Sequence, residues 1–226
     1  MQVAEDVDND TLGTAQEELD ILCAATHKNI IRYLGSIYYP DPRRELHIFT
    51  EYVECGTIRG MVDRFGCLPL LAIQKYLQQI LRGLSHLHSL NIVHRDIKGE
   101  NILVTKNGKV KLTDFGCSGV IIDINAESVG KPKEGEAPST TSAPSAGPVG
   151  SPVWMSPEII HGSPPGKPAD VWALGCVGIE MLDREVWQFG NTARGAGNPF
   201  LFMFKIGKAG TPPHRVPLRG GDGNTK

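Results

Sequence analysis

His94-Arg95-Asp96-Ile97-Lys98-Gly99-Glu100-Asn101 is the stretch that decides the fold, and Asp114-Phe115-Gly116 follows it. Between the two, apolar residues at 102–104 and 110–112 flank Asn107-Gly108. This dipeptide favours a type I′ turn, because both central residues of that turn need a positive φ. The sequence therefore predicts a β-hairpin that connects the two stretches.

Hydrophobic periodicity predicts the elements around this centre. Helical spacing indicates a first helix from a capping box at Thr14 and Glu17 to about residue 25. A hairpin is predicted from residues 30–39 and 46–50, with a break at Pro40-Asp41-Pro42. A long buried-face helix over 73–87, a second over 169–182 and a short one near 200–206 complete the prediction.

Composition excludes several classes of protein. The 226 residues are 40% hydrophobic, with 23 basic and 25 acidic side chains well mixed. Such a chain is globular, and no basic stripe or polybasic patch predicts a nucleic-acid or membrane partner. The five cysteines are scattered without C-x-x-C spacing, which favours a reducing cytoplasm over a disulfide framework or a zinc site. The acidic start and the lack of a long apolar run predict neither a signal peptide nor a membrane span.

The two central stretches resemble the catalytic loop and the magnesium-binding motif of eukaryotic protein kinases. This resemblance implies ATP and Mg²⁺ as cofactors. In that family Asp96 would orient the substrate hydroxyl and accept its proton, and Lys98 would place a positive charge at the γ-phosphate. A lysine there is typical of the serine/threonine class. Asn101 and Asp114 would offer the hard oxygen ligands that Mg²⁺ prefers.

Further matches supply the nucleotide pocket. The run Phe49-Thr50-Glu51-Tyr52-Val53 resembles the hinge, where the Glu51 carbonyl and the Val53 amide would face adenine. Leu103 would form the floor of the adenine pocket. By the family's pattern, Glu18 is the helix glutamate that normally pairs with a strand lysine.

The resemblance also implies a regulatory apparatus. Residues 150–158 resemble the end of an activation segment, in which Ser151 would hydrogen-bond Asp96 and Lys98. Arg95 would sense a phosphate on that segment. Residues 128–150 are rich in Ser, Pro and Gly with almost no large apolar side chain, so we expect a flexible regulatory insert within about 119–150. Ser142 and Ser145 are its preferred phosphosites, because they lie nearer the end that Ser151 anchors.

The implied fold is α+β and bilobal, with an incomplete β-rich N-lobe over 1–52 and a mostly helical C-lobe over 53–226. The runs Lys98-Gly99-Glu100-Asn101 and 27–35 are similar to the MAP kinase kinase kinase, or sterile-kinase, group. That group implies a serine/threonine kinase acting on a protein substrate, a MAP kinase kinase, in the cytoplasm. The alternative is a pseudokinase or scaffold fragment without catalysis.

The chain departs from the family at both ends. No glycine-rich loop is visible, and the first lysine of the sequence is Lys28, so Glu18 is expected to lack its strand lysine. The last helices, which normally carry an arginine that pairs with Glu158, are also missing from the pattern. We therefore expect this chain to bind ATP·Mg²⁺ weakly and to have negligible kinase activity.

Overall fold

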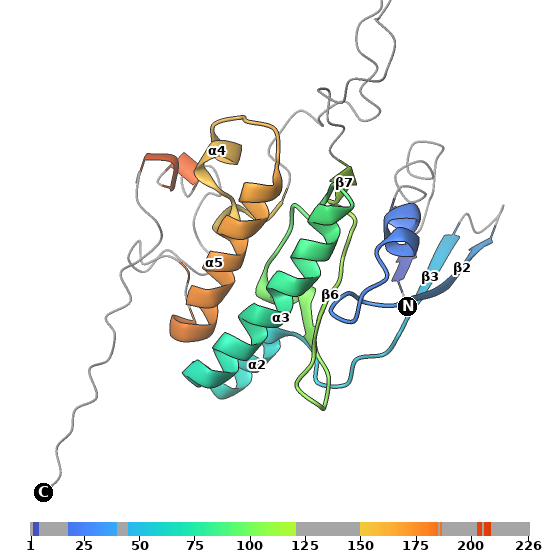
Figure 1. Cartoon of the computed structure of the whole chain (residues 1–226), viewed down its shortest axis with the longest axis horizontal. Coiled ribbons are helices and arrows are strands. Elements are labelled where there is room, and N and C mark those ends of the chain that lie inside the picture. The colour runs from blue at the N-terminus through green and yellow to red at the C-terminus, as the bar shows by residue number, and fades with distance from the viewer. Residues whose placement is uncertain are drawn as a thin grey trace, which may run out of the picture.

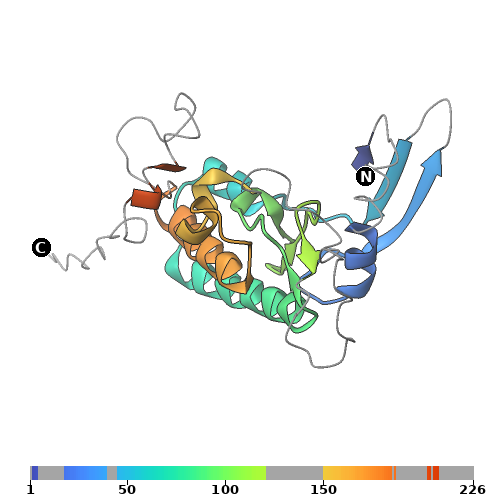
Figure 2. The ribbon, with the colours of Figure 1, turned by 90° about the horizontal axis from the view of Figure 1, so that it is seen from above.

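In the computed structural model, an N-terminal sheet lies on one side of the molecule and a mostly helical part lies on the other (Figures 1 and 2). The structure describes residues 2–4, 18–39, 45–120, 150–184, 186, 203–204 and 206–208. The sheet has the strand order β1-β3-β2 and is antiparallel, with β1 at Gln2–Ala4, β2 at Tyr33–Tyr39 and β3 at Glu45–Thr50. Residues 18–24 form a helix beside it.

The predicted hairpin is confirmed as β2 and β3. Its register runs from Tyr33 opposite Thr50 to Tyr39 opposite Glu45, with an irregularity between Tyr33 and Gly35. Leu46 and Ile48 are buried, whereas the intervening residues are partly exposed, as a strand with one buried face requires. The helix at 18–24 lies within the predicted range, and the capping box at 14 and 17 lies outside the described residues.

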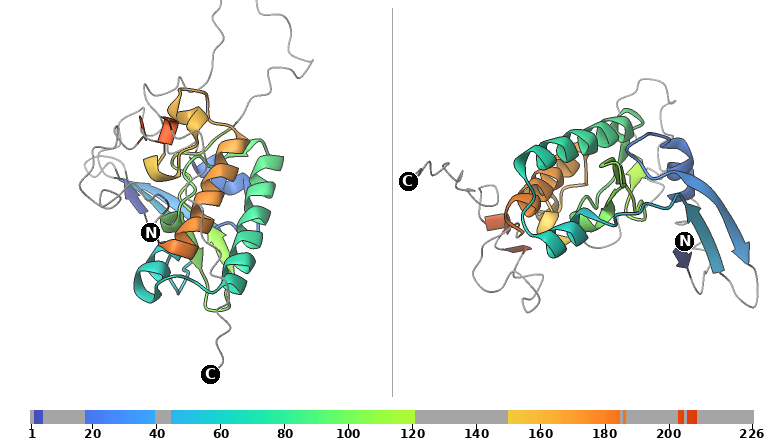
Figure 3. Two further views of the ribbon diagram at one scale, coloured as in Figure 1. Left: turned by 90° about the vertical axis from the view of Figure 1, so that its left-hand side faces the viewer. Right: turned by 90° about the horizontal axis from the view of Figure 1, so that it is seen from below.

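Two long helices form the centre of the other part. Helix α3 covers Leu70–Ser89 and α5 covers Lys167–Asp183, and the two run side by side (Figure 3). Both predicted helices are therefore confirmed. Their buried side chains share one core, which includes Ile73, Ile80, Leu84 and Leu87 from α3 and Leu174, Val177 and Met181 from α5. Helical residues at 203–204 and 206–208 agree with the predicted short helix.

Helix α2, at Ile58–Phe65, was not predicted. Its N-cap Thr57 accepts a hydrogen bond from the Gly60 amide at 3.0 Å, and Ile58 and Val62 are fully buried. Sequence reasoning missed it because a capping box needs Glu or Gln where Gly60 stands. The spacing of its apolar residues was the available signal.

Short strands and turns carry the chain between the helices. Strand β4 is Ile92–Val93, the 3-10 turn η1 is Gly99–Asn101, β5 is Ile102–Val104, β6 is Val110–Leu112 and β7 is Gly119–Val120. Strand β4 pairs with β7, and β5 pairs with β6. A second 3-10 turn, η2 at Pro152–Trp154, and helix α4 at Pro157–Ile160 precede α5.

The predicted β5–β6 hairpin is confirmed, but its type I′ turn is wrong. Gly108 has φ 69°, whereas Asn107 is not among the residues with positive φ. The last strand pair is Val104 and Val110, so the loop consists of residues 105–109 and not of Asn107 and Gly108 alone. Within the loop, Thr105 accepts the Gly108 amide with its carbonyl at 2.9 Å and the Lys109 amide with its hydroxyl at 3.0 Å. These bonds satisfy a wider loop, in which one glycine suffices.

Among the described residues, no helix is both long and apolar enough to cross a bilayer.

Candidate active site

A buried carboxylate accepts hydrogen bonds from the backbone of the loop that follows β4. Asp170, in the first turn of α5, is 1% exposed. One of its oxygens accepts the Arg95 amide at 2.9 Å, and the other accepts the His94 amide at 3.0 Å and His88 Nε2 at 2.8 Å. Arg95 takes the left-handed φ of 67°, which turns the chain so that both amides reach one side chain.

Four predicted site residues meet directly above this support. Lys98 Nζ donates to Asp96 Oδ2 at 2.6 Å and to Ser151 Oγ at 2.8 Å. The Ser151 amide donates to Asp96 Oδ1 at 3.0 Å, and Asn101 Nδ2 donates to both the carbonyl and the carboxylate of Asp96 at 2.9 Å. The expected contacts of Ser151 with Asp96 and Lys98 are therefore present.

The charge on Asp96 is stabilised by these donors. Burial acts to raise the pKa of this carboxyl, which is 7% exposed. The ammonium of Lys98 and the hydrogen bonds from Lys98 and Ser151 outweigh burial and hold the pKa below its ordinary value. Asp96 is thus an ionised acceptor at neutral pH, able to orient a hydroxyl and take its proton.

Asn101 and Asp114 lie close together because the Thr113 amide donates to the Asn101 carbonyl at 3.0 Å. Since the Nδ2 group of Asn101 is used by Asp96, its side-chain oxygen remains the free ligand atom. Asp114 takes φ 66° and is half-buried. An amide oxygen and a carboxylate suit Mg²⁺, which takes its other ligands from phosphate and water. No group of three or more His, Cys, Asp and Glu that could form an all-protein metal site is found in the part of the chain described.

Glu18 lies against the same motif. Burial raises the pKa of its carboxyl, the negative charge of Asp114 raises it further, and a hydrogen bond from the Phe115 backbone opposes both. No ion pair joins Glu18 to a basic residue within the described ranges. Two neighbouring carboxylates favour a cation between or beside them. Glu18 and Asp114 therefore suit a site for Mg²⁺.

The predicted hinge follows β3. The Glu51 amide donates to the Arg32 carbonyl at 2.9 Å, whereas no backbone partner is recorded in the described part for the Glu51 carbonyl or the Val53 amide. These two groups are therefore open to a ligand. Leu103 is half-buried in β5, which is bonded to the chain just after the hinge through Cys55–Val104 and Val104–Gly56. The structure thus brings Leu103 beside the hinge.

Arg95 lies between the two described ends of the expected insert. A Cβ at residue 119 would overlap the Arg95 guanidinium, and one at Gly150, whose φ is 112°, would lie 2.7 Å from the Arg95 carbonyl. The Arg95 side chain is half-buried, and its Nε is buried without a hydrogen-bond partner among the described residues. Ser142 and Ser145 lie outside the described residues, as does the insert itself between β7 and Gly150.

A family model for the protein kinase domain matches residues 1–205 of the chain. The chain belongs to the protein kinase family. A MAP3K epsilon protein kinase of Brassica napus is 38% identical over 182 residues, which are 79% of this chain and 12% of that protein. Mouse mitogen-activated protein kinase kinase kinase 19 is 39% identical over 74% of the chain and 12% of its own length. Cell division control protein 7 of Schizosaccharomyces pombe is 36% identical over 89% of the chain and 16% of its own length.

The fold is accordingly the α+β, bilobal fold of protein kinases. The kinase chain spans only 12% of the length of the relatives matched first. The family model covers the N-terminal sheet and all the site residues, including Glu18, Glu51 and Val53.

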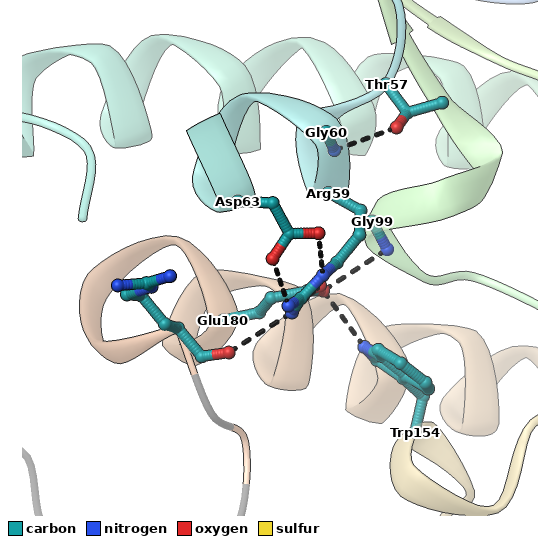
Figure 4. A network of polar contacts seen from close by, with 8 residues as sticks. Thr57, Arg59, Gly60, Asp63, Gly99, Trp154 and Glu180 are labelled. Atoms are coloured by element: carbon teal, nitrogen blue, oxygen red, sulfur yellow. Dashed lines mark hydrogen bonds and ion pairs between the residues drawn. The ribbon is translucent and has the colours of Figure 1, made fainter. Parts of the chain in front are cut away.

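A buried network beside the kinase catalytic loop was missed by sequence reasoning (Figure 4). Glu180 of α5 is 0% exposed, and its carboxylate accepts from Arg59 Nη1 at 3.1 Å, the Gly99 amide at 3.2 Å and Trp154 Nε1 at 3.3 Å. A Cβ at residue 99 would lie 2.7–2.9 Å from this carboxylate, so position 99 requires glycine. The signal was a glutamate inside the apolar pattern of α5, which must find partners when buried.

Whether Glu158 pairs with an arginine stays a prediction, because most of the chain after α5 lies outside the described residues. Glu158, in α4, is exposed and has no side-chain partner in the part that the structure describes. Arg59 and Glu180 form the deeply buried ion pair here, and they link α2 to α5. The segment around Trp154 is thus tied to α5 through Glu180.

His94 gives the kinase chain an expected acid sensitivity. The ring is 0% exposed, its Nε2 bonds the Thr113 carbonyl at 3.2 Å, and burial lowers its pKa although Asp170 and Asp96 oppose this. The unfolded chain takes up a proton below about pH 6.5, whereas the folded chain resists it. The free energy of unfolding should therefore fall by up to about 1.4 kcal/mol per pH unit below about pH 6.5.

Urea unfolding between pH 5 and pH 8 checks this prediction, with His94→Gln as the comparison, since glutamine can still donate to the Thr113 carbonyl. In the variant, the slope of the free energy of unfolding against pH should be smaller by the contribution of one titrating group. Parallel curves for the two proteins would show that His94 does not carry the effect.

Proposed function

We propose that this chain is the kinase domain of a protein serine/threonine kinase that transfers the γ-phosphoryl group of ATP to a protein hydroxyl. The observation that carries the proposal is the cluster of Asp96, Lys98, Asn101 and Ser151, with Asp114 beside it. ATP, held with Mg²⁺, supplies the phosphoryl group that moves to the substrate oxygen.

In this proposal Asp96 orients the substrate hydroxyl and takes up its proton. Its lowered pKa keeps it ionised and ready to accept at neutral pH. Lys98 contacts Asp96 and Ser151 at once, so it holds a positive charge beside the position of the transferred group. Asn101 and Asp114 hold Mg²⁺, while the Glu51 carbonyl, the Val53 amide and Leu103 bind adenine. Glu18 acts as the helix glutamate of the nucleotide site.

The relatives support the finer assignment. Several are named as MAP3K or mitogen-activated protein kinase kinase kinases, at 38% to 39% identity. We infer a protein substrate, a MAP kinase kinase, within a MAP kinase cascade in the cytoplasm. Residues 1–52 would form the N-lobe and 53–226 the C-lobe, with the insert at about 119–150.

Regulation would act through Arg95. Its guanidinium lies beside Gly119 and its backbone carbonyl lies beside Gly150, at the two described ends of the insert. A phosphate on Ser142 or Ser145 would give this guanidinium an anionic partner and draw the insert toward the catalytic loop. Ser151, bonded to Lys98, would mark the fixed end of the segment.

Nucleotide binding is the first test. We expect ATP with Mg²⁺ to raise the thermal unfolding temperature of this chain by a small amount, because a ligand of the folded state stabilises by mass action. Asp114→Asn should lose the part of the shift that depends on Mg²⁺. No shift at millimolar ATP and Mg²⁺ would contradict a nucleotide site.

Phosphoryl transfer is the decisive test. The chain is incubated with γ-labelled ATP, Mg²⁺ and a generic serine/threonine substrate, with Asp96→Asn as the matched control. The sequence predicts negligible transfer by this chain, so transfer that the control abolishes would contradict that prediction and support catalysis through the cluster that contains Lys98. Nucleotide binding without any transfer above the control would instead support a scaffold.

A further inference from the structure

A cavity of about 430 Å³ opens at the C-terminal end of helix 18–24. It lies between that helix, the segment that leads into β2, and β6. None of Asp96, Lys98, Asn101 or Asp114 lines it. Glu51 lines the cavity and also belongs to the site proposed above, but that site uses its backbone carbonyl and gives no role to its side chain or to the rest of this cavity.

Positive charge dominates its walls. Lys28, Arg32 and Lys111 line the cavity, whereas Glu51 is the acidic side chain among its described lining residues. Glu51 Oε1 is occupied by Lys111 Nζ at 2.5 Å and by the Arg32 amide at 2.7 Å. Lys28 and Arg32 have exposed side chains for which no carboxylate partner is recorded in the described part. This excess stands out in a chain whose formal net charge is −2.

His27 adds a neutral donor to the same walls. Its Nδ1 accepts the Asn29 amide at 3.2 Å, which places the ring proton on Nε2. Burial lowers the pKa of His27, and the charges of His86, Lys28 and Lys111 lower it further. The ring stacks on His86 with centroids 5.0 Å apart, which fixes its plane.

Apolar side chains complete the cavity. Leu22 and Ile31 are 5% and 3% exposed, and Tyr33 is half-buried beside them. The volume falls within the range of ligand sites and exceeds what one phosphate or carboxylate group fills. The walls thus match a ligand that carries several acidic groups next to an apolar side chain.

We propose that this basic pocket (Leu22, His27, Lys28, Arg32, Tyr33 and Lys111) is a docking site for an acidic peptide segment of a protein partner. Acidic side chains or phosphoserines of the segment pair with Lys28 and Arg32, and an apolar residue packs on Leu22 and Tyr33. Charge complementarity would speed encounter and select against basic segments. The proposal is independent of phosphoryl transfer.

Cys23 offers a direct probe, because its exposed thiol lines the pocket. An anionic and a cationic methanethiosulfonate each react with a thiolate to give a mixed disulfide and methanesulfinate. Peptide mapping by mass spectrometry follows each cysteine, with exposed Cys55 and Cys67 as internal controls. Cys176 is buried and its pKa is about 12, so it should stay unlabelled.

We expect the ratio of anionic to cationic labelling rates at Cys23 to exceed that at Cys67 by on the order of tenfold at low salt. Lys28→Glu/Arg32→Glu should abolish the difference. The matched control Arg64→Glu/Lys75→Glu makes the same charge change on exposed residues of α2 and α3 and should preserve it. Equal ratios at Cys23 and Cys67 in the unaltered chain would overturn the assignment of a basic pocket.

Peptide binding completes the test. Fluorescence anisotropy measures a labelled peptide that repeats Glu-Glu-Leu, the same peptide with phosphoserine in place of the acids, and a Lys-Lys-Leu repeat. We expect one or both anionic peptides to bind, and the tighter of the two identifies the acidic group that the pocket recognises. Lys28→Glu/Arg32→Glu should weaken this binding by about tenfold or more. The Lys-Lys-Leu repeat should not bind, and the control variant should bind normally. No binding of either anionic peptide, or binding that the pocket variant leaves unchanged, would overturn the proposal.

Discussion

Arg59→Met should destabilise the chain by about 3–5 kcal/mol, because it leaves the carboxylate of Glu180 buried without its charged partner. Glu180 is 0% exposed, and its other donors, the Gly99 amide and the Trp154 indole, are neutral. Asp63 and the Arg184 carbonyl hold the Arg59 side chain in its position. A lysine side chain from the surface therefore cannot take the place of Arg59 beside Glu180. Urea unfolding followed by circular dichroism measures the loss.

Two further variants separate the buried charge from the loss of packing. Arg64→Met alters an exposed arginine on the same helix and should cost about 0.5 kcal/mol or less. In Arg59→Met/Glu180→Gln the neutral amide oxygen can still accept from Gly99 and Trp154, and we expect much of the stability to return. If the double variant were no more stable than Arg59→Met, the unpaired charge would not be the cause.

Asp170→Ala should have a comparable effect, a loss of about 2–5 kcal/mol, for a different reason. It removes the acceptor of the His94 and Arg95 amides and of His88 Nε2. An unsatisfied buried donor costs about 1–3 kcal/mol, and the two amides belong to the backbone, which cannot turn away without moving Asp96. The same urea titration measures the loss.

A graded series makes this prediction specific. Asp170→Asn retains one oxygen acceptor, so its loss should lie between those of the wild type and Asp170→Ala. Val171→Ala, at the neighbouring exposed position of α5, should be nearly neutral. Equal losses for the Asn and Ala variants would show that the hydrogen bonds do not carry the stability.

Sequence reasoning reached the centre of the site because short-range chemistry specifies it. Asp96, Lys98 and Asn101 lie on one tight loop, and their contacts follow from that spacing. Long regular elements were also predictable, since α3 and α5 repeat their apolar residues over many turns. The hairpin of β2 and β3 followed from two apolar runs around a proline-rich break.

What sequence reasoning missed depends on partners that are distant in the chain. Glu180 contacts residues from α2, from η1 and from η2, and no local sequence pattern predicts these contacts. The turn type predicted at Asn107 was wrong for a related reason. The hydrogen bond to the hydroxyl of Thr105 and the positions of the two strand ends determine the conformation of this loop. The basic pocket likewise gathers Lys28, Arg32 and Lys111 from separate elements.

The contacts of Arg95 with Gly119 and Gly150 have a consequence for how this protein can vary. Because Gly119 lies against the side chain of Arg95 and Gly150 lies against its backbone carbonyl, the segment between these glycines closes a loop whose ends are already fixed. For such a loop each doubling of length costs only about 0.6 kcal/mol of closure entropy. Insertions and deletions between residues 120 and 150 are therefore tolerated without disturbing Asp96, whereas a side chain at either glycine is not.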